Sequence, residues 1–269
     1  MSYSITGKTA IVTGAANGVG LAIARHFVEK GANVMFVDID EARLEAELSD
    51  HPRDEGPVRY FTGDLCQKLT MANLISATVD AFDRIDILVN ASRQVALSDP
   101  LCPDDTPLDE MLKQNLTSSL RLSQMVARRM AAQTAADPEA TGPAGSIVNL
   151  STIAGQRTQP ELLAYSIAVA ALDQATRSLA VAYAPQRIRV NSVSFGSLMS
   201  ASLQASLRED DELRERIIAG TPLGRIAGAA EIVEAVQFLA SDASAFVTGQ
   251  VLTVDGGRTL IDPVGVPAH

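Results

Sequence analysis

The stretch Thr13-Gly14-Ala15-Ala16-Asn17-Gly18-Val19-Gly20 decides the fold of this 269-residue chain. An apolar run from Thr9 to Val12 leads into it and an amphipathic run from Leu21 to Val28 leads out, which predicts a strand, a tight turn and a helix. Glycines allow backbone conformations and close approaches that a Cβ would block. A helix N-terminus adds unpaired N–H groups and a positive dipole. The stretch therefore predicts a cradle for the pyrophosphate of a dinucleotide.

A second apolar run, from Asn33 to Val37, ends at Asp38. A carboxylate at this place accepts hydrogen bonds from the ribose hydroxyls of NAD and repels the 2′-phosphate of NADP. No Arg or Lys stands in the glycine turn or directly after Asp38. The alternative is an ordinary strand-to-helix turn with scattered glycines. We expect NAD, held by Gly14, Asn17, Gly18, Val19, Gly20, Asp38 and Ile39.

Apolar strands and amphipathic helices alternate along the chain, which indicates a parallel sheet covered on both faces. The expected fold is a single-domain α/β Rossmann fold over residues 1–269, with a doubly wound sheet of seven parallel strands. The strands are expected at 9–13, 33–37, 58–61, 85–89, 146–150, 189–193 and 251–254. The helices are expected at 19–29, 41–48, 71–82, 108–133, 163–183 and 230–239.

Residues 197–221 break this alternation and include a charged stretch. We expect a helix over 208–218, and we expect the whole segment 197–221 to form a mobile flap over the bound ligand.

The charge and the apolar runs exclude two classes of partner. The formal net charge is −10 and the pI is about 4.8, so no nucleic-acid partner is expected, because phosphate contacts need clustered Lys and Arg. The best candidate for a membrane span, residues 162–184, contains Asp173, Gln174 and Arg177. Charged residues within an apolar run argue against a membrane span.

The cysteines and histidines predict no metal site. Cys66 and Cys102 lack the spacing of metal ligands, so two free thiols in a reducing cytosol are expected. His26 and His51 lack a set of His, Cys or carboxylate partners at ligand spacing. The expected protein is therefore cytoplasmic and holds no metal.

Further motifs follow the glycine turn in a consistent order. They are Asp64-Leu65, Asp86–Asn90, Gln114-Asn115-Leu116, Gly145–Thr152, Tyr165, Pro222–Arg225 and Thr248–Gly257. With these motifs the chain resembles the short-chain dehydrogenase/reductase family over nearly every residue from Thr9 to Gly257. The resemblance implies an oxidoreductase that transfers hydride between NAD(H) and a small carbonyl or alcohol.

The resemblance also extends the expected cofactor site. In the family, the Asp-Leu pair contacts adenine, and the place of Ser200 holds a threonine that meets the carboxamide. The implied additions to the cofactor-binding set are Asp64, Leu65, Asn90, Ala91, Ser92, Tyr165, Gly196, Leu198 and Ser200.

Four catalytic positions of the family read Tyr165, Thr152, Asn115 and Val169 in this chain. The family's tyrosine exchanges a proton with the substrate, its serine holds the carbonyl, and its asparagine helps to hold a water. Its lysine, four residues after the tyrosine, binds ribose and lowers the tyrosine pKa. Thr152 keeps a hydroxyl, and Ser151 is an alternative donor. Adjacent strand residues face opposite ways, so only one of the two is expected to face the substrate.

Val169 is the main departure from the family. Residues four apart share a helix face, so Val169 is expected beside Tyr165, and no lysine follows Lys113. An unassisted tyrosine side chain has a pKa of about 10, which leaves about one part in a thousand ionised at pH 7. Alcohol oxidation needs the phenolate and is expected to suffer more than carbonyl reduction, which needs the phenol.

Arg93 stands where the family has a glycine after the fourth strand. One hypothesis is that its guanidinium replaces the missing charge or binds an anionic group of the substrate. The alternative is that Arg93 points to solvent or plugs the cleft. Gln156 and Leu198 are further candidate substrate residues.

The leading interpretation is an oxidoreductase with impaired chemistry. The Ala-rich stretch 164–184 and the expected helix 108–133 suit close helix packing between subunits, and the resemblance implies a homo-oligomer, a dimer or tetramer, that uses them. The same pattern could instead pack inside one subunit. The alternative is a non-catalytic NAD-binding protein or a structural partner subunit, because function depends on the site and not on the fold alone.

Overall fold

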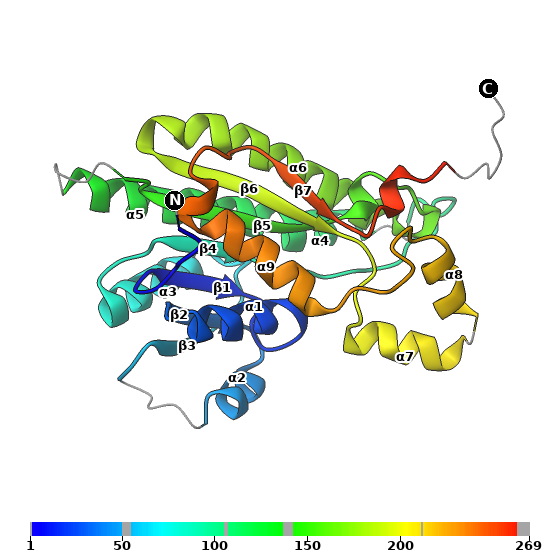
Figure 1. Ribbon diagram of the computed structural model, residues 1–269, viewed down its shortest axis with the longest axis horizontal. Helices are drawn as coiled ribbons and strands as arrows, with labels where there is room; N and C mark the ends of the chain where they lie inside the picture. Colours follow the sequence, from blue (N-terminus) through cyan, green and yellow to red (C-terminus); the bar gives the residue numbers. More distant parts are fainter. Residues whose placement is uncertain (1, 50–54, 105–106, 137–141, 211, 263–269) are drawn as a thin grey trace.

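Seven parallel strands form one sheet in the order β3-β2-β1-β4-β5-β6-β7 (Figure 1). The structure is a computed structural model that describes residues 2–49, 55–104, 107–136, 142–210 and 212–262. Its strands are β1 (Thr9–Thr13), β2 (Asn33–Asp38), β3 (Val58–Thr62), β4 (Ile87–Asn90), β5 (Gly145–Thr152), β6 (Ile188–Phe195) and β7 (Val251–Val254). The predicted single-domain Rossmann fold is confirmed.

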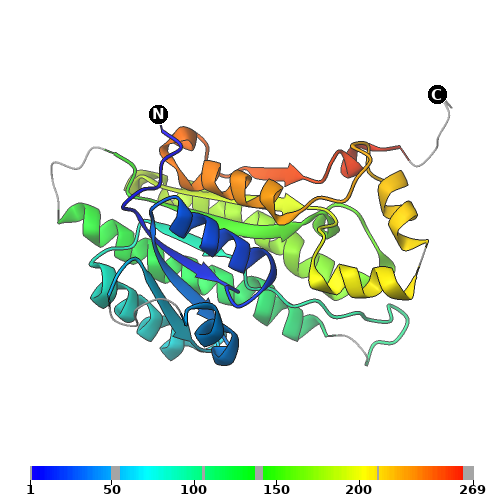
Figure 2. The same ribbon diagram turned by 60° about the horizontal axis from the view of Figure 1, so that its bottom comes forward.

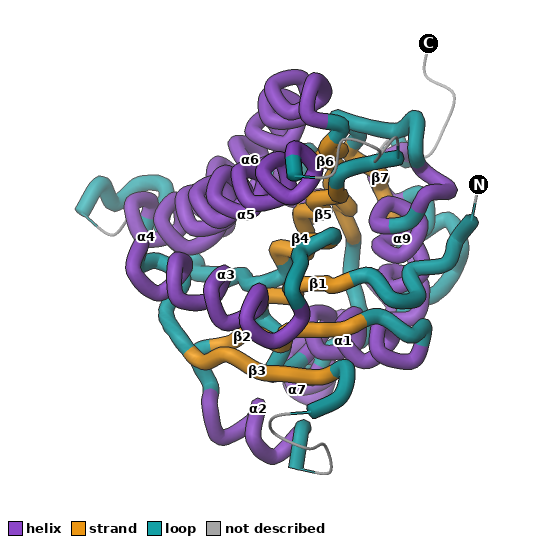
Figure 3. The backbone as a smooth tube through the Cα atoms, turned by 90° about the vertical axis from the view of Figure 1, so that its left-hand side faces the viewer, coloured by secondary structure: helices purple, strands orange, loops and turns teal. Residues whose placement is uncertain are grey.

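Helices cover both faces of the sheet. They are α1 (Gly18–Glu29), α2 (Glu41–Glu47), α3 (Lys68–Phe82), α4 (Leu108–Leu112), α5 (Ser118–Ala135), α6 (Leu163–Tyr183), α7 (Ala201–Glu209), α8 (Leu213–Ala219) and α9 (Ala229–Ala240). Helices α1 and α9 pack side by side on one face (Figure 2). Helices α5 and α6 lie on the opposite face of the sheet (Figure 3).

Strand β1 shows why both faces are apolar. Its buried Ala10 and Val12 join the core under α1 and α9, whereas Ile11 joins the core under α3, α5 and α6. Successive side chains of a strand point to opposite faces, so a strand covered on both sides must be apolar throughout. This requirement explains the continuous apolar runs in the sequence.

Strand β1 lies between β2 and β4, so the strand order reverses there. The connections leave to opposite sides at this point, and a crevice opens at the carboxyl ends of β1 and β4. The glycine turn follows β1, and Arg93 follows β4. The topology therefore places both sequence features at one crevice.

The predicted helix at 208–218 is wrong, because the segment forms two helices, α7 and α8. The Asp210 carboxylate accepts the backbone N–H groups of Glu212 and Leu213 at 3.0 and 3.1 Å. A side-chain acceptor at this place satisfies the free N–H groups of a new helix. The motion of 197–221 as a flap stays a prediction.

Two other boundaries differ from the expected ones. The expected helix at 108–133 is divided by a wider π-helical turn at Lys113–Thr117. Strand β4 begins at Ile87 and not at Ile85, because the Gln133 side chain binds both the N–H and the C=O of Ile85, at 3.0 and 2.9 Å. The backbone of Ile85 is therefore occupied before the strand ladder starts.

The cysteines and one of the two histidines considered in the sequence lie within the described residues. Cys66 and Cys102 are free cysteines. His26 binds Gln237 at 2.6 Å and so links α1 to α9, and His51 lies outside the described residues. In the part of the chain that the structure describes, no helix is long and apolar enough to cross a membrane.

Replacing Gly20 by Ala should destabilise the fold, because a Cβ there would lie 2.2 Å from the Gly14 carbonyl oxygen. We expect a loss of about 1–3 kcal/mol in the free energy of unfolding, typical of overpacking, measured by urea denaturation. The control is Gly142→Ala, where an added Cβ meets nothing within 4 Å. A Gly20→Ala protein as stable as this control would contradict the close packing.

Candidate active site

The glycine turn has the geometry that its sequence predicted. Gly14 and Gly18 have φ angles of +67° and +58°, which favour glycine. A Cβ on Gly14 would lie 2.9 Å from the Ser92 backbone, so the turn packs directly against the chain that leaves β4. Next to Gly18 an added Cβ would meet nothing within 4 Å. The turn is therefore closely packed against the protein at Gly14 and leaves free space at Gly18, on the side of the crevice.

Asp38 ties the end of β2 to the glycine turn. Its carboxylate accepts the N–H of Ala16 at 3.0 Å, of Ile39 at 2.8 Å and of Asp40 at 3.1 Å. These bonds hold the carboxylate at the rim of the crevice, where the remaining lone pairs can accept hydroxyl groups.

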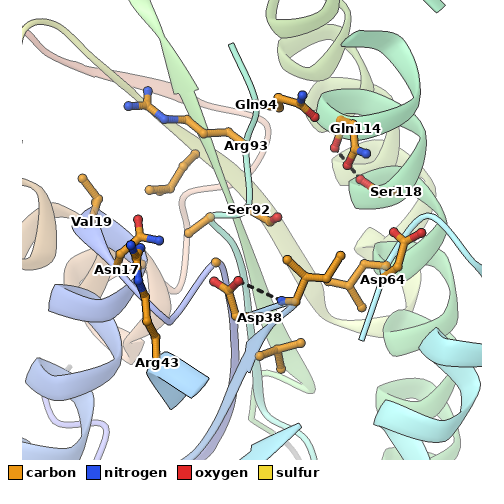
Figure 4. Close-up of a pocket in the computed structure, with 18 of the residues that line it drawn as sticks. Asn17, Val19, Asp38, Arg43, Asp64, Ser92, Arg93, Gln94, Gln114 and Ser118 are labelled. Atoms are coloured by element: carbon orange, nitrogen blue, oxygen red, sulfur yellow. Dashed lines mark hydrogen bonds between the residues drawn. The ribbon is translucent and has the colours of Figure 1, made fainter. Parts of the chain in front are cut away.

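A cavity of about 630 Å³ runs along the crevice (Figure 4). Thirteen predicted site residues line it. These are Gly14, Asn17, Gly18, Val19, Gly20, Asp38, Ile39, Asp64, Leu65, Ala91, Ser92, Arg93 and Ser200. Eight further residues line the cavity without having been expected from the sequence, namely Val37, Arg43, Gly63, Gln94, Gln114, Ser118, Leu150 and Phe195.

Arg43 is the most informative residue that the sequence analysis missed. It lines the cavity beside Asp38 (Figure 4), and its Nε lies 3.2 Å from an oxygen of Asp40. Arg43 lies in the first turn of α2, about one helical turn after Ile39, which also lines the cavity. Helical periodicity could therefore have indicated that Arg43 faces the cavity. A guanidinium can bind a phosphate, so the end of the cavity near Asp38 carries charges of both signs.

Asp64 marks the end of the cavity near β3. Its carboxylate accepts the N–H of Cys66 at 2.8 Å and the side-chain amide of Gln67 at 3.3 Å. The hydrogen bond from the Cys66 backbone, helped by Gln67, lowers the pKa of Asp64 below its ordinary value. Asp64 therefore stays negative at neutral pH.

Two side chains fix the segment that leaves β4. The Thr13 hydroxyl accepts the N–H groups of Ala91 and Ser92, both at 3.0 Å. The buried Asn115 amide accepts the Gln94 N–H at 2.9 Å and donates to the Gln94 carbonyl at 2.9 Å. Asn115 also donates to the carbonyl of Met111, so both of its N–H groups are used within the protein. Its role in holding a water stays a prediction.

Tyr165 and Thr152 come together at the end of β5. Both side chains are buried, and the Thr152 hydroxyl lies 3.5 Å from the Tyr165 hydroxyl. The buried Ser151 hydroxyl has no hydrogen-bond partner among the described residues. The structure thus directs Thr152, and not Ser151, toward the tyrosine.

Val169 lies in the same buried apolar cluster as Tyr165, as expected from their spacing. The cluster also contains Met111, Ala164 and Ala168. The side chain of Val169 is only 3% exposed, so an isopropyl group occupies the helix face next to the phenol.

Arg93 lies over the ring of Phe195, with 4.9 Å between its guanidinium carbon and the ring centroid. Its side chain reaches across the cavity in Figure 4. The interaction with Phe195 places its charge on the β6 side of the cleft.

Eight predicted site residues do not line the cavity, namely Asn90, Asn115, Ser151, Thr152, Gln156, Tyr165, Gly196 and Leu198. The buried Asn90 amide donates to Ser123 at 3.0 Å and to Asn149 at 2.8 Å, so it connects the sheet to α5. Leu198 is buried, and Gln156 is exposed in the turn that follows β5.

The cavity fits a dinucleotide at the glycine turn. A Cβ at Gly14 or Gly20 would collide with backbone, whereas the space at Gly18 and the N-terminus of α1 stay open. Asn17, at the N-cap of α1, makes no capping bond with its side chain, so the first N–H groups of this helix are available to an anion.

Comparison with known proteins supports this geometry. A family described as enoyl-(acyl carrier protein) reductase matches residues 14–259. The cis-4-hydroxycyclohexanecarboxylate dehydrogenase of Sinomonas cyclohexanicum is 34% identical, over 97% of this chain and 100% of its own. The structure of a short-chain type dehydrogenase/reductase from Mycobacterium ulcerans has a TM-score of 0.86 at 28% identity, over 96% of this chain and 91% of its own.

A second solved structure resembles this chain. It is a 7α-hydroxysteroid dehydrogenase complexed with NADH and 7-oxo glycochenodeoxycholic acid, with a TM-score of 0.83, 27% identity and 95% coverage of each chain. The chain therefore belongs to the short-chain dehydrogenase/reductase family of oxidoreductases. Members of this family use a nicotinamide cofactor.

Asp173 should make stability depend on pH. Burial raises the pKa of its carboxyl above 3.8, and Ser192 offsets the shift only in part. A raised native pKa means that the charged form destabilises the fold. The penalty is absent below pH 3.8 and appears as the pH rises through the native pKa.

Asp173→Asn should therefore gain stability relative to the wild type as the pH rises from about 4 to 7. Urea denaturation at several pH values measures the difference, with Asp80→Asn as a control at an exposed site. A difference that does not change with pH would contradict the proposed burial penalty.

Proposed function

We propose that this oxidoreductase binds NAD and transfers hydride between NAD(H) and a small carbonyl or alcohol, with proton transfer impaired by Val169. The observation that carries the proposal is the contact between Thr152 and Tyr165 beside a buried valine. The hydroxyl pair that handles the substrate oxygen is kept, while the neighbouring position is apolar.

The roles of the residues follow from their positions. Gly14, Gly18 and Gly20 leave room for the pyrophosphate, and Asp38 accepts the ribose hydroxyls. When bound, the nicotinamide supplies or accepts the hydride. Thr152 holds the substrate oxygen through its hydroxyl, and Tyr165 exchanges a proton with that oxygen.

The missing cation affects the two directions unequally. Reduction of a carbonyl uses the neutral phenol of Tyr165 as an acid. Oxidation of an alcohol needs the phenolate as a base, and Val169 offers this form no positive charge. Carbonyl reduction is therefore the favoured direction.

A non-catalytic NAD-binding protein, or a structural partner subunit, is the second candidate. Val169 and the position of Arg93 over Phe195 both favour it, because they leave the phenol without a cation and place a side chain across the cleft. In this case NADH would bind, and no carbonyl would be reduced.

We also propose a cytoplasmic homo-oligomer, a dimer or tetramer. Helix α6 supports this, because its apolar Leu163, Ile167 and Val181 are 43%, 42% and 79% exposed. A second copy of the chain could cover these residues. The alcohol named for the Sinomonas relative supports a small substrate.

Val169→Lys should restore the missing charge. We expect turnover of small ketones with NADH to rise about tenfold or more, since each unit of pKa changes the ionised fraction tenfold. Alcohol oxidation at pH 7 should gain more than ketone reduction. The control is Val169→Met, which adds a comparable length without charge.

Equal activity in the lysine and methionine variants, with NADH bound to both, would favour the non-catalytic protein. NADH binding measured by calorimetry separates this outcome from loss of the cofactor site, and thermal unfolding detects any loss of fold from the buried ammonium.

The wild-type protein should bind NADH more tightly than NADPH, by about tenfold or more, because like charges in contact cost several kcal/mol. Asp38→Asn should narrow this ratio, measured by calorimetry with both cofactors. The companion variant is Arg43→Gln, since Arg43 lines the same end of the cavity. Tighter binding of NADPH by the wild type, lost in Arg43→Gln, would overturn the choice of NAD.

A further inference from the structure

The reactive half of the cleft is crossed by Arg93. Its guanidinium lies over Phe195, the last residue of β6, although Arg93 itself follows β4. Strand β5 lies between β4 and β6 in the sheet. The side chain therefore spans the carboxyl end of β5, where Thr152 stands, and Thr152 is the register partner of Phe195.

The backbone on both sides of Arg93 is held in place. Before it, the N–H groups of Ala91 and Ser92 donate to Thr13. After it, the N–H and C=O of Gln94 bind the buried amide of Asn115. Because the backbone is hydrogen-bonded on both sides of Arg93, the position of its Cα and the direction of its Cα–Cβ bond are fixed. An arginine on a free surface loop lacks this restraint.

Arg93 makes no ion pair with any residue that the structure describes, although the chain carries a net charge of −10. Other arginines are paired with carboxylates, among them Arg25, Arg43, Arg84, Arg216 and Arg225. The positive charge beside the candidate reactive hydroxyls is thus left uncompensated.

The contact with Phe195 uses no N–H donor of Arg93, and no described residue accepts a hydrogen bond from its guanidinium. An arginine stacked on a ring uses its flat face, while its N–H donors point outward in the guanidinium plane. These donors form a planar fork that matches the two oxygens of a carboxylate or phosphate.

A second guanidinium, that of Arg258, contacts the segment that follows β6. Arg258 donates to the Ser197 hydroxyl at 2.8 Å, two residues beyond Phe195. The described part of the chain offers Arg258 no carboxylate partner either. Positive charge therefore gathers at the end of β6 in an acidic protein.

We propose that Arg93 is a specificity-determining residue that binds an anionic group of the substrate, a carboxylate or a phosphate, next to the carbonyl that Thr152 and Tyr165 receive. This inference rests on the proposed function and adds the class of substrate. The substrate is then a small oxo or hydroxy compound with an anionic group held over Phe195.

The test measures binding, so it does not require turnover. Calorimetry in the presence of saturating NADH compares 4-oxopentanoate with its methyl ester, and dihydroxyacetone phosphate with dihydroxyacetone. We expect the wild type to bind one anionic ligand about tenfold or more tightly than its neutral partner, as charge-assisted hydrogen bonds predict. The pair that shows the preference identifies the anion as a carboxylate or a phosphate.

Arg93→Gln should remove this preference and leave the binding of the neutral partner unchanged. The matched control is Arg157→Gln, since Arg157 is an exposed arginine after β5 that does not line the cavity. This control should keep the preference. Arg93→Lys should keep only part of it, because an ammonium lacks the planar fork.

Three outcomes would overturn the inference. The first is a wild type that binds NADH but binds the anionic and neutral ligands equally. The second is an Arg93→Gln variant that binds every ligand more tightly, which would make Arg93 a plug. The third is a variant that loses affinity mainly for NADH, which would assign Arg93 to the cofactor. Failure of the wild type to bind NADH would instead reject the proposed function.

Discussion

The close packing of the glycine turn against the end of β4 is the constraint on which the site depends. Gly14 lies so near Ser92 that no Cβ would fit, and the Thr13 hydroxyl binds the N–H groups of Ala91 and Ser92. These contacts join the two halves of the sheet where the strand order reverses. The glycine turn and the backbone segment that carries Arg93 are therefore held together as one rigid unit.

Two neighbouring hydroxyls stand beside a buried valine at the end of β5, and an arginine lies over Phe195. Tyr165 keeps a hydroxyl neighbour in Thr152, but the α6 side next to it is filled by Val169. A positive charge stands at the end of β6, on Arg93 over Phe195. A cation over Phe195 is suited to bind an anionic group, which is the basis of the proposed substrate class.

The sequence predicted the sheet and the conformation of the glycine turn well, because both depend on local patterns. Apolar runs predicted all seven strands, and the glycine turn and Asp38 line one cavity as expected. The prediction of one helix at 208–218 was wrong, since the pattern of charges does not reveal that Asp210 accepts the N–H groups at the start of α8. The π-helical turn around Asn115 was missed for a similar reason, as helical periodicity does not resolve one wider turn.

By itself, the sequence determined the order of the elements, the glycine turn and the presence of a valine four residues after Tyr165, because periodicity and residue type carry this information. Only the tertiary structure decided that Thr152, and not Ser151, meets Tyr165, and that Arg93 crosses to Phe195. At the end of a strand the direction of a side chain depends on elements far away in the sequence. Its contacts become known only when those elements are packed together.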